Sequence, residues 1–319
     1  MTGRHRRSRV KDKQWITPHI VRITVDCGSH YRHTGTDGHV ALYFYPPEAR
    51  VPPEFAADNL TALHTFGSPQ VRRYTVQRYD PSHGTVDLDF VVHEPAGLAS
   101  TWARDAVIGD EVLWWGPTEA WHLPELTRTL ILVADETGLP AVASILRELT
   151  EGAQAHVIAL VADRSAEAYL TLPLSATGAE THVTWIHRGP ASGEPPAKFL
   201  RTLDDVADLL SSEPADTIAL WSGTEFAEAG AVRRTLLRSR GPLDKANTNV
   251  TSYWIHGQAQ DARPDARNRR RNLDNRARYP DEARFTSTRK VVRRCRTKVP
   301  TKRTGEPVGT RVPHPGRHG

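Results

Sequence analysis

The sequence predicts two successive domains, an antiparallel β-barrel and then an α/β domain built on a parallel sheet. Its length of 319 residues is typical of about two domains. Short alternating strands bounded by turn residues fill the chain from about residue 15 to 117, as in a small barrel or sandwich. After Pro124, apolar strands alternate with helical patterns, which favours a parallel sheet covered on both faces.

The bounds of the expected barrel strands follow from the alternation of apolar and polar residues and from the turn residues between the strands. The segment before Pro46 and Pro47 is continuously apolar, as in a buried strand, and the last strand ends at a Gly-Pro pair. The strands are expected at residues 21–25, 39–44, 72–75, 85–91 and 109–117.

The α/β half is expected to alternate strictly between the two kinds of element. Its strands are predicted at residues 129–134, 155–161, 181–187, 216–221 and 249–255, and its helices at 138–149, 198–211 and 225–238. Residues 189–196 contain glycine and proline and are expected to form a surface loop.

The charge of the chain is divided unevenly. Residues 257–319 carry 15 Arg and 3 Lys against 6 Asp and Glu, a net of +12, whereas residues 1–256 carry −7. The basic segment has few large apolar residues and no period, so we expect residues 258–319 to be disordered. It could be a nucleic-acid-binding tail, but we favour either plain disorder or a sequence translated out of frame or past the stop codon of the gene. We expect no nucleic-acid partner.

Several classes of protein are excluded by composition. The two cysteines, Cys27 and Cys295, provide neither a disulfide framework nor a metal quartet, and the histidines have no metal-ligand spacing. No apolar run is long enough to cross a bilayer, and no apolar region follows the basic N-terminus. We therefore expect a cytoplasmic protein with no bound metal and no membrane partner.

The segment Arg72-Arg73-Tyr74-Thr75 combines a cation, an aromatic ring and a hydroxyl on one expected strand. Alternate side chains share a face, so Arg72 and Tyr74 point one way and Thr75 the other. Such a group could offer a charge to a phosphate, a ring to a flavin and a hydroxyl to a ring nitrogen. An ordinary edge strand with an exposed arginine is the alternative.

Residues 97–101 are expected at the start of a helix, where free backbone amides and the Ser100 hydroxyl suit a diphosphate. Ser100 could equally be a plain N-cap, and His93, after the preceding strand, an ordinary loop histidine.

The segment Asp135-Glu136-Thr137 marks a turn from strand to helix, the place where an α/β domain meets a nucleotide. It lacks a glycine fingerprint, and its acidic side chains are not expected to touch phosphate; ordinary turn chemistry is the alternative. Arg164 or Arg188 could pair with a 2′-phosphate, whereas Asp163 argues against one. NADH and NADPH both remain open, with a slight preference for NADPH.

Taken in order, these motifs resemble those of the siderophore-interacting protein family, an FAD-using branch of the ferredoxin reductase superfamily. The resemblance covers residues 14–257 and rests on Arg72-x-Tyr74-Thr75, Asp89-Phe90-Val91-x-His93, Ala99-Ser100-x-Trp102, Asp135-Glu136-Thr137, Thr184-Trp185-x-x-Arg188 and Tyr253-Trp254.

The resemblance implies a role for each matching position. Arg72 would bind the FAD diphosphate, Tyr74 would lie against the flavin ring, and Thr75 would hydrogen-bond near N5. The remaining implied positions are His93 along the ribityl and phosphate path, Ala99, Ser100 and Thr101 at phosphate, Trp102 on adenine, and Asp135 and Thr137 at the nucleotide edge.

The resemblance also implies a fold and an activity. Residues 14–117 would form the FAD barrel and 118–257 the NAD(P)H domain of a ferric-siderophore reductase, with ferric siderophore and nicotinamide nucleotide as partners. No side chain is expected to act as a catalytic nucleophile or base, because the flavin carries the chemistry. A general flavin reductase or electron-transfer flavoprotein is the alternative.

Overall fold

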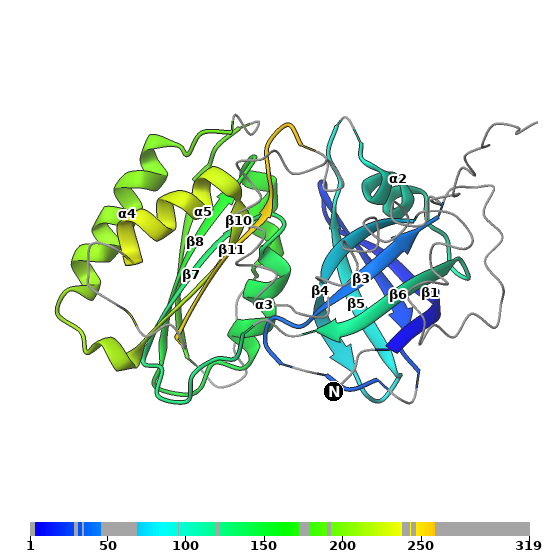
Figure 1. Cartoon of the computed structure of the whole chain (residues 1–319), viewed down its shortest axis with the longest axis horizontal. Coiled ribbons are helices and arrows are strands. Elements are labelled where there is room, and N and C mark those ends of the chain that lie inside the picture. Colours follow the sequence, from blue (N-terminus) through cyan, green and yellow to red (C-terminus); the bar gives the residue numbers. More distant parts are fainter. Residues whose placement is uncertain are drawn as a thin grey trace, which may run out of the picture. The chain divides into compact units, whose positions relative to one another are not determined.

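A computed structural model describes residues 4–28, 31–33, 35–45, 69–94, 96–118, 121–171, 179–189, 193–237, 243 and 247–258. The first half is a closed antiparallel barrel with strand order β1-β2-β5-β4-β3-β6, which confirms the predicted barrel (Figure 1). Its elements are β1 (Arg4–Thr17), β2 (Ile20–Asp26), β3 (His39–Phe44), β4 (Gln70–Asp80), β5 (Thr85–Val91), α2 (Leu98–Asp105) and β6 (Glu111–Thr118).

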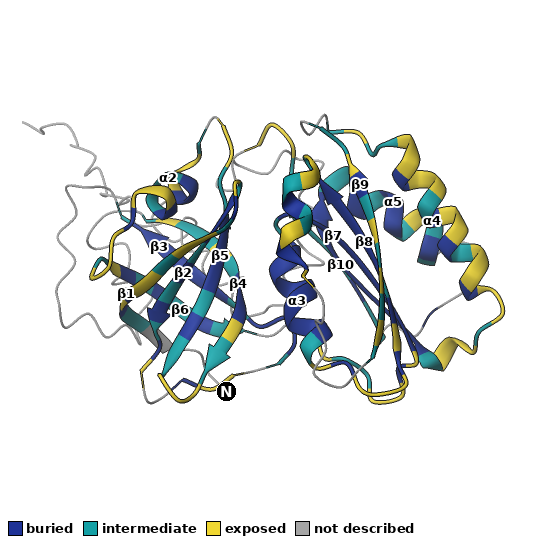
Figure 2. Ribbon diagram, turned by 180° about the vertical axis from the view of Figure 1, so that it is seen from behind, coloured by how far each residue is buried: buried dark blue, intermediate teal, exposed yellow. Residues whose placement is uncertain are grey.

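The interior of the barrel is filled by one side of each strand. Along β2, Val21, Ile23 and Val25 are fully buried while the residues between them are partly exposed, so the period of two that predicted this strand is also its packing pattern. Figure 2 shows buried, intermediate and exposed positions along the barrel strands.

Strand β1 begins at Arg4, within a segment whose many arginines gave no strand pattern in the sequence. Residues 4–9 pair with β6 and residues 10–17 with β2, so this one strand closes the barrel. Ser8 is buried on it, with its hydroxyl donating to the Asp26 carbonyl at 2.5 Å and accepting from Trp114 Nε1 at 2.8 Å. The barrel thus includes residues ahead of position 14, where the FAD domain was expected to begin.

The second half is a five-stranded parallel sheet of order β11-β10-β7-β8-β9, which confirms the predicted α/β domain. Its elements are β7 (Thr129–Asp135), α3 (Leu139–Arg147), β8 (Gln154–Val161), η1 (Arg164–Tyr169), β9 (Glu180–His187), α4 (Ala197–Leu210), η2 (Ala215–Thr217), β10 (Ile218–Glu225), α5 (Phe226–Val232), η3 (Arg233–Leu237) and β11 (Thr248–Trp254).

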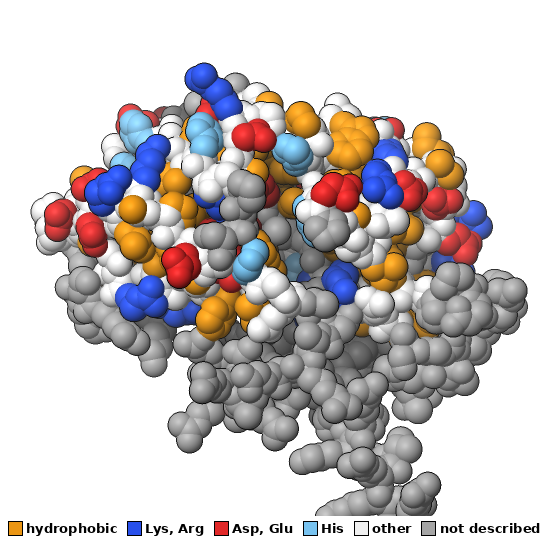
Figure 3. All heavy atoms as spheres, turned by 90° about the horizontal axis from the view of Figure 1, so that it is seen from above, with side chains coloured by type: hydrophobic (Ala, Val, Ile, Leu, Met, Phe, Trp, Pro, Cys, Tyr) orange, Lys and Arg blue, Asp and Glu red, His pale blue; other side chains and the backbone are white. Residues whose placement is uncertain are grey.

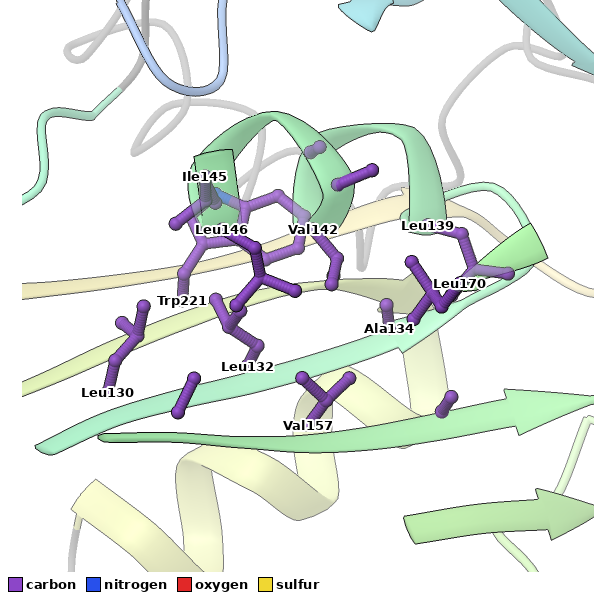
Figure 4. Packing of buried hydrophobic residues seen from close by; sticks show 14 of the residues in the cluster. Leu130, Leu132, Ala134, Leu139, Val142, Ile145, Leu146, Val157, Leu170 and Trp221 are labelled. Carbon is purple, nitrogen blue, oxygen red and sulfur yellow. The ribbon is translucent and has the colours of Figure 1, made fainter. Parts of the chain in front are cut away.

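Helices cover both faces of this sheet, as its continuously apolar strands require. On one face, α3 packs Val142 and Leu146 against Leu132 and Trp221 (Figure 4). On the other face, Phe199 and Leu203 of α4 join Ile131 and the residues of α5 in a separate buried cluster.

Strand β10 and the helical segment after it differ from their predicted bounds. The sequence predicts a strand ending at residue 221, but β10 continues to Glu225, and all eight of its residues are buried. The helix predicted over 225–238 is a short α5 followed by a π-helical turn at Arg233–Leu237. No helix among the described residues is long and apolar enough to cross a membrane. The predicted basic tail lies outside the described residues.

Asp37, in the loop before β3, connects the barrel to the sheet. Its buried carboxylate accepts hydrogen bonds from the Trp121 amide at 2.9 Å, Trp221 Nε1 at 3.1 Å and Asn249 Nδ2 at 3.2 Å. These donors come from the linker, β10 and β11, so one side chain joins three parts of the α/β half to the barrel loop.

Candidate functional site

Helix α2 begins after the loop that follows β5. Its N-cap is Gly97, no side chain caps it, and its first turn contains no acidic residue. The first amide bonded within the helix is that of Thr101, which donates to the Gly97 carbonyl at 2.9 Å. The three preceding amides have no partner within the helix, which is the arrangement that binds a phosphate.

The side chains expected at phosphate have different surroundings. Ser100 is buried, and its hydroxyl donates to the Val91 carbonyl at 2.9 Å, so it fastens α2 to the end of β5. Ala99 is also buried, whereas Thr101 is partly exposed. At Ser100 the backbone amide, not the hydroxyl, is the group left to meet an anion.

Arg72 lies near the beginning of β4 and is partly buried. Its guanidinium donates to the Val71 carbonyl at 3.0 Å and to Gln70 Oε1 at 3.1 Å, which holds it along its own strand. The predicted role of Arg72 at the diphosphate stays a prediction.

Tyr74 stands against a group of aromatic rings from β3, β5 and α2. Its ring centroid is 4.1 Å from that of Phe90, which is 5.4 Å from Trp102, and Trp102 is 5.7 Å from Phe44. Burial raises the pKa of Tyr74 well above its usual range, so its phenol stays protonated. A ring backed by other rings in this way is fixed in orientation, which suits a platform for a flat ligand.

The structure thus brings together some of the residues that were predicted to bind the flavin. Tyr74 and Trp102 both contact Phe90, and Thr75 is buried on β4 next to Tyr74. His93 is exposed on the loop after β5, and no contact ties it to the aromatic group. The open α2 start, a charged Arg72 and a supported Tyr74 fit the diphosphate and ring of FAD.

Asp135 ends β7 and has no exposed surface. One carboxylate oxygen accepts from the Thr137 amide at 2.8 Å and hydroxyl at 2.6 Å, and the other accepts from the Glu225 amide at 2.9 Å and Trp254 Nε1 at 2.7 Å. Four protein donors therefore occupy this carboxylate and tie together the ends of β7, β10 and β11. The predicted nucleotide roles of Asp135 and Thr137 remain predictions, and this geometry makes Asp135 a residue that shapes the edge.

Arg188, considered from sequence as a 2′-phosphate ligand, lies between two glutamates. It donates from Nη1 to Glu228 Oε1 at 2.6 Å and from Nη2 to Glu136 Oε2 at 2.8 Å, and its guanidinium carbon is 6.0 Å from the centre of the Trp254 ring. Its side chain is only 8% exposed. The sequence predicted Arg188 at this edge but not the two carboxylates that hold it.

These side chains form what we term the carboxyl-edge cluster, comprising Asp135, Glu136, Arg188, Glu225 and Glu228. The oxygens of Glu225 accept from the amides of Ala227 and His256, and Glu136 accepts from the amide of Ala162. Burial, together with nearby Asp135 and Glu225, raises the pKa of Glu228 to about 7, against the opposing effect of Arg188. Burial raises the pKa of Glu136 as well.

The sequence contained only part of the signal for this cluster. Glu136 and Arg188 stood within motifs already quoted, but their contact joins positions 52 residues apart and needs the strand order to be seen. Glu228 lies on α5 in a segment with no motif. From above, Figure 3 shows acidic, basic and histidine side chains intermixed, with no continuous basic area over the described residues on that face.

Comparison with known proteins places the chain. A profile of the "Siderophore-interacting FAD-binding domain" matches residues 9–121, and one of the "Siderophore-interacting protein" matches residues 127–257. The chain belongs to the siderophore-interacting protein family. The two matches together cover more than half of the chain and correspond to the barrel and the sheet, in that order.

Individual relatives agree with this assignment. A siderophore utilization protein from T. fusca is 30% identical with a TM-score of 0.65, covering 81% of this chain and 95% of its own. The ferric acinetobactin reductase of Acinetobacter baumannii is 25% identical over 213 residues, 66% of this chain and 70% of its own. An NADPH-dependent ferric-chelate reductase of Escherichia coli is 31% identical over 139 residues, 43% of this chain and 54% of its own.

The family confirms the predicted cofactor and class of protein, an FAD-containing oxidoreductase. A ferredoxin-NADP+ reductase from Plasmodium falciparum, at 11% identity and a TM-score of 0.55, shows the same fold. The predicted fold of the ferredoxin reductase superfamily is therefore confirmed as well.

Proposed function

We propose that this protein takes electrons from a reduced nicotinamide nucleotide and delivers them to ferric siderophores, releasing Fe(II) in the cytoplasm. The observation that carries the proposal is the match of both siderophore-interacting profiles, in order, to a barrel and a parallel sheet. The names of the reductases from A. baumannii and E. coli support iron reduction as the activity.

The residues of the barrel would hold FAD without taking part in bond making. The free amides at the start of α2 and the charge of Arg72 would bind the diphosphate, and Tyr74, supported by Phe90, would orient the ring. Thr75, His93 and Trp102 keep the roles that the family resemblance implies. Bound FAD supplies the conversion of a two-electron hydride into single electrons.

The residues of the sheet would position the nicotinamide nucleotide. Ligands of open α/β sheets bind outside the carboxyl ends of the strands, where the strand order reverses. Here that point lies between β7 and β10, where the Asp135 carboxylate at the end of β7 accepts a hydrogen bond from the Glu225 amide at the end of β10. One nicotinamide carries two electrons, so each hydride would reduce two ferric ions. Fe(II) has a lower charge than Fe(III), so oxygen ligands hold it less tightly.

Anaerobic mixing tests the proposal. FAD-loaded protein is combined with NADH or NADPH and then with ferric siderophores, while flavin absorbance and an Fe(II)-specific chelator are followed. We expect bleaching by the nucleotide and recovery with stoichiometric Fe(II) on adding a ferric siderophore. Fast reduction of free flavin or a protein acceptor, with no siderophore turnover, would instead identify a general flavin reductase.

A further inference from the structure

The carboxyl-edge cluster bears on which nicotinamide nucleotide the protein accepts. It holds four carboxylates and one guanidinium, from Asp135, Glu136, Glu225, Glu228 and Arg188. Each of the four acidic residues is 7% exposed or less. At a pH above the raised pKa of Glu228, with all of them ionised, the cluster carries a net charge of −3, at the edge of the sheet where a nucleotide would lie.

Arg188 is already bound on two sides. Both terminal nitrogens donate to carboxylates, at 2.6 Å to Glu228 and 2.8 Å to Glu136, in an environment nearly closed to water. Turning the guanidinium toward a phosphate would leave at least one of these glutamates buried without a partner, which is strongly unfavourable. Arg188 therefore neutralises its neighbours and is not available as a phosphate receptor.

Arg164 is the other cation that the sequence placed at this edge, after β8. Its side chain is 88% exposed, and its Nε lies 3.8 Å from Glu167 Oε2. Solvent and salt screen the charge of an arginine so fully in water, which weakens its attraction for an anion. Asp163 beside it holds Ser165 through its own carboxylate and adds negative charge.

We propose that the carboxyl-edge cluster makes this protein selective for NADH over NADPH. The two nucleotides differ only in the 2′-phosphate, whose negative charge is repelled by the cluster, whereas a 2′-hydroxyl is neutral and can donate to a carboxylate. Burial is the main reason that the pKa of Glu228 is raised, and the charges of Asp135 and Glu225 add to that rise. The inference rests on the proposed function, because it concerns the electron donor of that reaction.

A binding measurement tests the selectivity without requiring turnover. Adenosine 5′-monophosphate and adenosine 2′,5′-bisphosphate, which differ only in the 2′-phosphate, are titrated calorimetrically into the full FAD-loaded chain. We expect the monophosphate to bind about tenfold more tightly or better, the scale of one unfavourable charge contact. Equal binding, tighter binding of the bisphosphate, or no binding of either would overturn the inference.

Two variants assign the effect to the cluster. At pH 8, above the pKa of Glu228, Glu228→Gln removes one charge while keeping an oxygen for Arg188, and it should reduce the preference for the monophosphate at least about threefold. Glu148→Gln removes the same charge at the opposite end of α3, where the side chain is 47% exposed, and should leave the ratio unchanged. A ratio that is the same in Glu228→Gln as in the wild type would refute the assignment.

Flavin reduction separates this inference from the proposed function. NADH should bleach the flavin with a higher kcat/KM than NADPH, by about the same factor as in the titration. If NADH reduces the flavin but no ferric siderophore reoxidises it, the proposed acceptor is wrong and the nucleotide preference stands.

Discussion

Glu228 gives the folded protein a specific dependence on pH. Its carboxyl is 4% exposed, and its pKa is raised from 4.5 to about 7, chiefly by burial. Between these two values the unfolded chain has released the proton while the folded protein still holds it. Stability must therefore fall as pH rises from about 4.5 to about 7. At 1.36 kcal/mol per pKa unit, the contribution of this one group is about 3 kcal/mol.

Glu228→Gln isolates this contribution because glutamine is neutral in both states at every pH. The free energy of unfolding, measured with denaturant at pH 5, 6, 7 and 8, should decline more steeply for the wild type than for the variant. The difference between the two proteins should change by about 3 kcal/mol across the series, in favour of the variant at high pH. The Glu148→Gln control should run parallel to the wild type. A constant difference between wild type and Glu228→Gln would refute the reasoning.

Three further substitutions test other contacts. Asp37→Ala leaves three buried donors without their acceptor and should lower the free energy of unfolding by about 3–6 kcal/mol, measured by denaturant; a loss below about 1 kcal/mol would contradict this. Gly138→Ala would press a methyl group into the Gly223 carbonyl, so we expect a loss of about 1–3 kcal/mol in thermal unfolding, and an unchanged Tm would count against it. Arg72→Ala should weaken FAD binding by about 1.5–3 kcal/mol in a fluorescence titration, and an unchanged Kd would remove Arg72 from the site.

Most of the fold could be predicted because the hydrophobic pattern of each segment indicates its secondary structure. Strand β2 alternates, β7 is apolar at nearly every position, and both patterns persist in the packing. The beginning of β1 was not predicted. Only Ser8 and Val10 are buried there, and the surrounding arginines, Arg4, Arg6, Arg7 and Arg9, leave no alternating hydrophobic pattern in the sequence. Its strand conformation depends on pairing with β6, a partner about a hundred residues away, which no local pattern reveals.

The parts of the candidate site that could be predicted are those whose role follows from a single short segment of the sequence. The Arg72 and Tyr74 pair follows from alternation on a strand, and the open start of α2 follows from Gly97. What Arg188 does, in contrast, depends on Glu136 and Glu228, which reach it from the turn after β7 and from α5. An arginine at a nucleotide edge looks the same in sequence whether it is free or doubly paired.

The helix starts show where anions could still be accepted. Glu225 caps α5 through its own carboxylate and Glu228 adds a second acid to that first turn, so this start is already supplied with negative charge. Helices α2 and α3 begin instead at Gly97 and Gly138, with no side-chain cap and no acid in the first turn. Free amides and the helix dipole favour phosphate, and at the start of α2 three amides have no partner within the helix. In α3, by contrast, Pro140 has no N–H and the Ala141 amide donates to the Gly138 carbonyl, so the start of α2 is the better suited of the two to a diphosphate.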